Sequence, residues 1–211
     1  MRTRIKVCGL TRLDDAWRAV ELGVDALGFV FWPGSPRCVS LRQAAPIAAA
    51  LPPFVSTVGV FVNQPLEEIR AVAASLGLSA IQLHGDEAPC SWGDVPGRCI
   101  KAIGVGKGFD TAAVAAWPQE VWPLLDAHDL ARRGGTGRAV DWDVAAAVSR
   151  GRPIILAGGL DASNIREAVA RVRPFAVDVS SGVEREAGIK DPDRLRAFVE
   201  AVAAADAAQL P

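Results

Sequence analysis

Short apolar runs rich in valine and isoleucine alternate with alanine-rich stretches from one end of the chain to the other. The apolar runs have the length of strands, whereas the alanine-rich stretches repeat their apolar positions with a helical period. This alternation predicts βα units and a parallel sheet. The expected strands are residues 5–9, 26–31, 56–61, 80–84, 99–105, 121–126, 153–158 and 176–180.

The helical patterns between these strands differ in strength. Pro46 predicts that the second helix begins late or kinks, because proline lacks the backbone N–H. Pro89 interrupts a fourth helix around residues 86–92, and Pro118 leaves a short fifth helix at 111–118. The clearest helices are residues 13–23, 65–77, 141–149, 161–172 and 191–205.

Eight units in 211 residues leave about 26 residues per unit, near the lower size limit of a closed (β/α)8 barrel. We therefore predict an α/β protein with one compact TIM-barrel domain over residues 1–211, in which the fourth and fifth helices are weak or short. A doubly wound open sheet is the alternative.

Charge and composition narrow the choice of partners. Lys and Arg (23) nearly balance Asp and Glu (24), so we expect no basic surface for nucleic acid. No apolar run has the length of a membrane span, and the first residues do not resemble a signal peptide. The 4 cysteines form no CxxC pair. We expect a cytoplasmic monomer or homodimer with reduced thiols and a small-molecule substrate, without a membrane partner.

The alternation of side chains along a strand predicts which residues share the barrel interior. If Cys8 points inward, so does Lys6, and Asp178 and Ser180 share one face of the last strand. Closure of the barrel puts the first and last strands side by side, so we expect a buried ion pair between Lys6 and Asp178. Further polar groups are expected in the interior from Gln82, His84 and Lys101.

Two glycine-rich segments follow the last two expected strands, at residues 157–160 and 179–183. Glycines allow backbone N–H groups to approach an anion, and barrel enzymes often bind phosphate after strands seven and eight. Either segment alone is also typical of an ordinary turn. Together they predict a phosphate monoester site at Gly158, Gly159, Ser180, Ser181 and Gly182.

Cys8 and Asp126 both end strands, at the edge where parallel barrels carry their active sites. A free cysteine is often a small buried hydrophobe, and a strand-end aspartate often caps a helix or forms an ion pair. A base and an acid that face one cavity suit proton transfer on a sugar phosphate. We interpret both residues as catalytic candidates.

Arg37 lies in a proline-stiffened loop, and its guanidinium can hold a carboxylate through two hydrogen bonds. His84 and Asp178 are further substrate-binding candidates, although a structural role explains His84 as well. The two histidines lack the spacing of metal ligands, so we expect no metal site. Residues 134–137 are glycine-rich and predict either a lid or a surface connection.

Taken together, the motifs resemble the phosphoribosylanthranilate isomerase family of tryptophan synthesis. The matching segments span almost the entire chain in order: KVCGLTR (6–12), GFVFWPGSPR (28–37), VGVFVNQ (58–64), QLHGDE (82–87), LLDA (124–127), GGTG with DW (134–142), LAGGL (156–160), VDVSSGVE (177–184) and GIKD (188–191). As a set they are highly specific, although AGG or GGTG alone is not.

The resemblance implies an Amadori rearrangement of N-(5-phosphoribosyl)anthranilate without a cofactor. At the matching positions, Asp126 is the general acid that opens the ribose ring, and Cys8 is the general base that removes the C2 proton. Arg37 holds the anthranilate carboxylate, and the glycine-rich segments hold the phosphate. A cation or a helix N-terminus must then stabilise the thiolate, whereas Asp126 must keep its proton in an enclosed pocket.

Three positions depart from the family pattern, namely Cys38, Val140 and Ala187, and none is a proposed catalytic residue. A related isomerase of histidine synthesis has an aspartate at the end of strand one, so Cys8 argues against that function. A non-catalytic sugar-phosphate scaffold needs no pairing of Cys8 with an acid. A cysteine-nucleophile enzyme needs a nearby histidine base, which the sequence does not offer.

Overall fold

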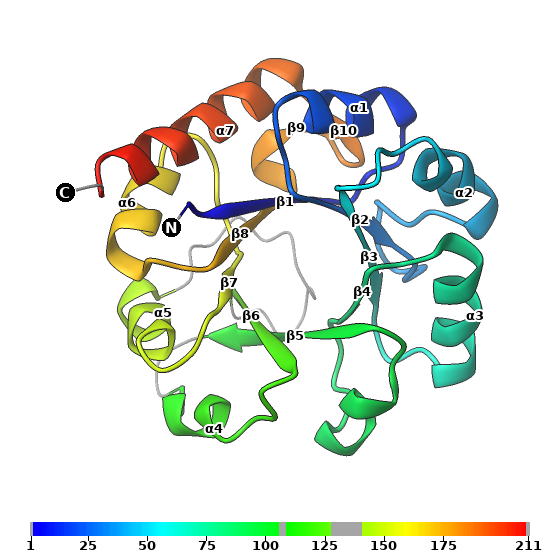
Figure 1. The fold of residues 1–211 in the computed structure, drawn as a ribbon, viewed down its shortest axis with the longest axis horizontal. Helices are drawn as coiled ribbons and strands as arrows, with labels where there is room; N and C mark the ends of the chain where they lie inside the picture. The colour runs from blue at the N-terminus through cyan, green and yellow to red at the C-terminus, as the bar shows by residue number, and fades with distance from the viewer. Residues whose placement is uncertain (1, 106–108, 128–140, 210–211) are drawn as a thin grey trace.

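The computed structural model describes residues 2–105, 109–127 and 141–209. Parallel strands close into a barrel, and helices surround it in a ring (Figure 1). The barrel strands are β1 Arg4–Cys8, β2 Ala26–Val30, β3 Ser56–Phe61, β4 Ala80–Leu83, β5 Arg98–Val105, β6 Val121–Ala127, β7 Ile155–Leu156 and β8 Ala176–Val179. Pairing of β1 with β8 closes the barrel and places Lys6 opposite Asp178. The predicted TIM barrel is confirmed, and the open doubly wound sheet is wrong.

Four of the seven described α-helices begin where a side chain accepts from free backbone N–H groups. Ser40 and Gln43 form a capping box before α2, and the side chains of Asp110, Asp141 and Asp191 accept from the first turns of α4, α5 and α7. The helices are α1 Leu13–Glu21, α2 Leu41–Ala49, α3 Leu66–Leu76, α4 Thr111–Ala115, α5 Trp142–Ser149, α6 Ile165–Val172 and α7 Pro192–Ala207.

The weak fourth and fifth helices are confirmed. A short 3-10 helix, η1 Pro89–Asp94, takes the fourth place, and the five residues of α4 take the fifth. A late start of α2 is wrong, because the capping box at Ser40 begins the helix before Pro46. By contrast, α6 begins later than residue 161, since Asp161 holds the residues after it in a turn.

The apolar side chains form an inner and an outer layer. The smaller buried cluster takes members from β3 to β8 and fills the barrel interior, and the larger cluster lies between strands and helices. Ile100 and Ala102 belong to the inner cluster, so the alternation along β5 turns Lys101 outward. The expectation that Lys101 lies in the interior is therefore wrong. Its Nζ instead lies 2.7 Å from the Glu87 carboxylate, in the loop after β4.

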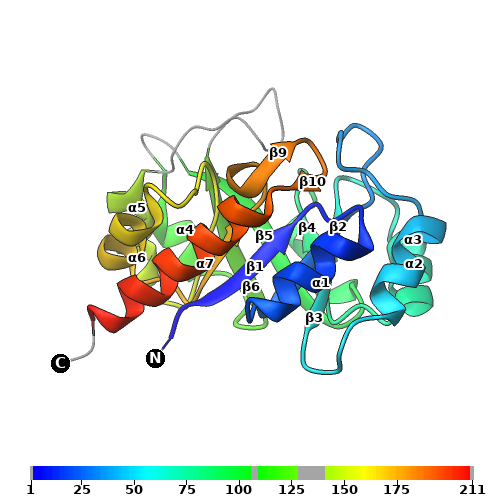
Figure 2. The same ribbon diagram turned by 90° about the horizontal axis from the view of Figure 1, so that it is seen from above.

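A small antiparallel hairpin follows β8 and lies outside the barrel. It consists of β9 Glu184–Glu186 and β10 Ile189–Lys190, and the 3-10 turn η2 Ser181–Val183 precedes it. Figure 2 shows this hairpin at the end of the barrel opposite the two chain termini. The carboxyl ends of the barrel strands meet at the same end, which is where barrel enzymes carry their active sites.

Candidate active site

A cavity of about 400 Å3 opens at the carboxyl ends of the strands. Trp32 and Val60 are among the residues that line this cavity. Nine of the ten predicted site residues line the same cavity: Cys8, Arg37, His84, Asp126, Gly158, Gly159, Asp178, Ser180 and Ser181. The tenth, Gly182, lies beside it in η2. The fold thus gathers residues that are far apart in the sequence.

The predicted ion pair of Lys6 and Asp178 is confirmed below Cys8. The Lys6 Nζ lies 2.9 Å from each Asp178 carboxylate oxygen, and both side chains are buried. Burial alone would lower the pKa of Lys6, but the charge of Asp178 holds it above its ordinary value. Lys6 therefore stays a cation inside the barrel.

Cys8 ends β1 and is only 8% exposed. Burial raises the pKa of its thiol above the ordinary value, and the Lys6 ammonium opposes this shift. The cation that a thiolate requires is therefore present, although it offsets the burial only in part. The backbone carbonyl of Cys8 accepts a hydrogen bond from the Ser180 hydroxyl at 3.1 Å.

Asp126 lies near the end of β6, and His84 contacts it from the end of β4. The His84 Nε2 is 3.3 Å from the Asp126 Oδ2. The His84 Nδ1 is 2.9 Å from the amide nitrogen of Gln82, a residue buried in the barrel. With that amide as donor, Nδ1 accepts and Nε2 carries the ring proton toward Asp126. His84 thus contacts Asp126, the candidate general acid.

Glycine is required in both glycine-rich segments, by the backbone conformation in one and by a close contact in the other. Gly158 and Gly159 have φ angles of 81° and 65°, in the left-handed region that favours glycine. The Asn164 side chain donates to the Gly159 carbonyl at 2.8 Å and holds this turn at the start of α6. Gly182 packs against the Leu160 carbonyl so closely that no side chain fits. The loops after β7 and β8 therefore form one surface.

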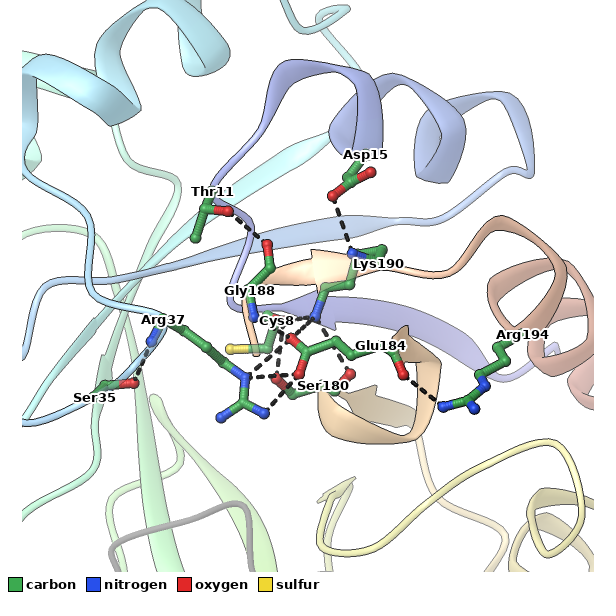
Figure 3. A network of polar contacts seen from close by, with 10 residues as sticks. All are labelled: Cys8, Thr11, Asp15, Ser35, Arg37, Ser180, Glu184, Gly188, Lys190 and Arg194. Atoms are coloured by element: carbon green, nitrogen blue, oxygen red, sulfur yellow. Dashed lines mark hydrogen bonds and ion pairs between the residues drawn. The ribbon is translucent and has the colours of Figure 1, made fainter. Parts of the chain in front are cut away.

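Two charged residues near the cavity, Glu184 and Lys190, were missed by the sequence reasoning. Glu184 accepts from Arg37 through Nε and Nη2, at distances of 2.6–3.1 Å. Lys190 lies 2.7 Å from the same carboxylate and 2.6 Å from the Cys8 carbonyl (Figure 3). Both residues fall in segments that carry the family resemblance, VDVSSGVE and GIKD, but no local pattern marks them.

Three further features considered from the sequence are a metal site, a membrane helix and a lid. Within residues 2–105, 109–127 and 141–209, no three acidic, histidine or cysteine side chains gather as a metal site. Over the same residues, no helix has the length and apolar character needed to cross a membrane. The predicted lid at residues 134–137 lies outside the described residues.

A closed parallel barrel with a polar cavity at the carboxyl ends of its strands defines the TIM-barrel enzymes as a class. Comparison with known families identifies the particular branch. The family model described as N-(5'phosphoribosyl)anthranilate (PRA) isomerase matches residues 5–201. The chain belongs to this isomerase family.

Individual relatives agree over nearly full length. The N-(5'-phosphoribosyl)anthranilate isomerase of Citrifermentans bemidjiense is 48% identical over 197 residues, covering 93% of this chain and 95% of the relative. A phosphoribosyl anthranilate isomerase in complex with reduced 1-(o-carboxyphenylamino)-1-deoxyribulose 5-phosphate is 41% identical, with a TM-score of 0.85 over 96% of this chain and 99% of that one. Monomers generated from the dimeric Thermotoga maritima enzyme are 39% identical, with the same TM-score of 0.85 and coverage of 96% and 99%.

Proposed function

We propose that this isomerase converts N-(5-phosphoribosyl)anthranilate to 1-(2-carboxyphenylamino)-1-deoxyribulose 5-phosphate, the third step of tryptophan synthesis from chorismate. The reaction is an Amadori rearrangement that moves protons and needs no cofactor. The observation that carries this proposal is the convergence of a thiol from β1 and a carboxyl group from β6 on one cavity.

Asp126 acts as the general acid. It protonates the ring oxygen of the ribose, and the ring opens to a Schiff base between the sugar and the anthranilate nitrogen. His84 lies 3.3 Å from the Asp126 carboxyl group, and both side chains line the cavity. Asp126 is also partly enclosed, with a side chain that is 15% exposed.

Cys8 acts as the general base. Its thiolate removes the C2 proton of the Schiff base, and the resulting enolamine tautomerises to the ketone. The positive charge on the protonated Schiff base makes this C2 proton more acidic, so a thiolate is basic enough. Lys6 supports the ionised form from below, against the cost of burial.

The remaining candidates bind the two ends of the substrate. The backbone of Gly158 and Gly159, with the turn at 180–182, suits the phosphate, and its closeness to the start of α6 adds a favourable helix dipole. Arg37 suits the anthranilate carboxylate. Glu184 occupies its Nε and Nη2 edge, which leaves the edge formed by Nη1 and Nη2 for a second carboxylate.

The test is the loss of substrate fluorescence during turnover by the purified protein. The wild type is expected to turn over phosphoribosylanthranilate, and Cys8→Ser and Asp126→Asn are each expected to lower kcat about a hundredfold or more. Thermal unfolding of each variant checks that the fold is retained.

Three outcomes would contradict parts of this proposal. A wild type that binds without turnover favours a sugar-phosphate scaffold. A wild type that neither binds nor turns over the substrate removes the function. Variants with near-normal kcat remove the roles of Cys8 and Asp126 while leaving the function in place.

A further inference from the structure

The β9–β10 hairpin is tied to the catalytic end of β1 by several contacts. The Thr11 hydroxyl donates to the Gly188 carbonyl, and the Lys190 backbone N–H donates to the Asp15 carboxylate at 3.0 Å. Figure 3 shows these contacts on both sides of Cys8. The hairpin is therefore joined to the loop after β1, although more than 170 residues separate Lys190 from Asp15 in sequence.

The Lys190 ammonium lies at the centre of this junction. Its side chain is 1% exposed, and it donates to the Cys8 carbonyl at 2.6 Å, the Ser180 carbonyl at 3.3 Å and the Glu184 carboxylate at 2.7 Å. An ammonium has three hydrogens, so all of them are used. The end of the strand that carries the thiol is thus joined to the end of the strand that leads to the phosphate site.

Glu184 connects this ammonium to Arg37. Its side chain is 3% exposed. Burial opposes its ionisation, but the hydrogen bonds from Arg37 and Lys190 outweigh burial and hold the pKa of Glu184 below its ordinary value. One carboxylate between two cations leaves a net positive charge beside the cavity. It also fixes the plane of the Arg37 guanidinium through a two-point contact.

Burying these charges costs free energy, because they lose their hydration. Apolar groups of similar volume therefore often replace a buried ion pair without loss of stability. Fold stability alone therefore does not account for these residues. Their contacts end on two groups of the proposed reaction, the carbonyl of the residue that bears the thiol and the guanidinium that faces the substrate carboxylate.

We propose that Glu184 and Lys190 are positioning residues of this active site: Glu184 orients Arg37 for the substrate carboxylate, and Lys190 fixes the backbone at the Cys8 thiol. This inference deepens the proposed function and rests on it for the roles of Cys8 and Arg37. The shared carboxylate couples recognition of the aromatic acid to placement of the base.

The Glu184 half is tested by binding of a product analogue. Reduced 1-(2-carboxyphenylamino)-1-deoxyribulose 5-phosphate is compared with its counterpart that lacks the carboxyl group, by calorimetry on wild type and Glu184→Gln. We expect the variant to bind the carboxylated ligand about tenfold more weakly or worse and the other ligand unchanged. The variant makes the cluster more positive, so a purely electrostatic role of Glu184 predicts tighter binding instead. Equal loss for both ligands, or tighter binding, would overturn the proposal.

The Lys190 half is tested on the thiol itself. The rate of Cys8 alkylation by iodoacetamide is followed against pH in wild type and Lys190→Met, by mass spectrometry of the Cys8 peptide. We expect the midpoint to move to higher pH and kcat to fall about tenfold or more, because the carbonyl anchor and a nearby cation are both lost. An unchanged midpoint together with an unchanged kcat would overturn the Lys190 role.

Two control variants change side chains that contact the same hairpin but do not contact Arg37 or the Cys8 carbonyl. Thr11→Val removes the contact to Gly188, and Arg194→Met removes the 2.6 Å hydrogen bond to the Glu184 carbonyl. Both are expected to leave ligand selectivity and the thiol midpoint unchanged. If Lys190→Met does not fold, the Glu184→Gln comparison still decides the role of Glu184. If the wild type shows no turnover, the proposed function fails, and the alkylation profile still decides the role of Lys190.

Discussion

Lys6 and Lys101 are both buried lysines on barrel strands, and each pairs with one carboxylate at short distance. Lys6 points into the barrel and pairs with Asp178 at 2.9 Å, whereas Lys101 points outward and pairs with Glu87 at 2.7 Å. Their burial is similar, so their cost to folding is similar. What differs is the neighbour of each ammonium: the thiol of Cys8 inside the barrel, and the Gly85 carbonyl outside it.

The two buried lysine–carboxylate pairs therefore act on different groups. The main charges that act on the pKa of Cys8 are those of Lys6, Asp178 and Lys190. Lys101 instead donates to the Gly85 carbonyl at 2.6 Å, while Glu87 accepts from the Gly85 backbone N–H. The outer pair thus holds the loop that follows His84. The inner pair acts directly on the thiol of the proposed base, whereas the outer pair contacts only the backbone of the loop after His84.

The largest effect is expected from Lys6→Met. The change leaves the Asp178 carboxylate buried without its cation, so the free energy of unfolding should fall by about 3–5 kcal/mol in urea denaturation. It also removes the cation that lowers the pKa of Cys8, so the pKa of the thiol rises further. If Cys8 is the general base, as proposed, it must lose its proton, so the rise of kcat/KM with pH should move to higher pH.

The double variant Lys6→Met with Asp178→Leu serves as the control for stability. It removes both charges and should recover most of the lost free energy of unfolding, since neither charge is left buried alone. If the single variant keeps the wild-type pH profile, Lys6 does not influence the thiol, and the two pairs do not differ in their effect on Cys8.

A smaller loss of stability is expected from Lys101→Met, about 1.5–3 kcal/mol, because Glu87 loses its cation but keeps the hydrogen bonds from the Asn63 and Gly85 backbone N–H groups. Burial raises the pKa of Glu87, but the hydrogen bonds from Lys101 and from the Asn63 backbone N–H outweigh it and keep this pKa below its ordinary value, and the variant loses the Lys101 part. The pH dependence of kcat/KM should nevertheless stay in place, since Lys101 is remote from the thiol. A shift as large as that of Lys6→Met would show that the two pairs are equivalent.

The two lysines also show how far the sequence could predict the interior. Closure of a barrel makes strands one and eight neighbours, so the register of Lys6 with Asp178 followed from topology and alternation together. Lys101 had no such constraint. Strands of a parallel barrel are apolar on both faces, so alternation alone does not reveal which face of β5 is inside.

The hairpin after β8 was beyond sequence reasoning for a different reason. Its strands contain three and two residues, too few for a periodic signal. The partners of Lys190 are backbone carbonyls and a carboxylate brought together only by the closed barrel. The positions of Cys8 and Asp126, in contrast, followed from their places at strand ends, because parallel strands of a barrel finish at one rim.

The smallest effect is expected from His84→Leu, which tests the contact between His84 and Asp126, the proposed general acid. The variant removes the 3.3 Å contact to Asp126, so kcat should fall by up to about tenfold, and it leaves the buried Gln82 amide without its His84 partner, so the free energy of unfolding should fall by about 1 kcal/mol or more. His84→Gln retains a donor and should recover part of the rate. If Lys101 acts on catalysis only through the loop after His84, the double variant Lys101→Met with His84→Leu should have the kcat of His84→Leu alone. Independent, multiplied losses in kcat would mean that the outer pair reaches the reaction by another route.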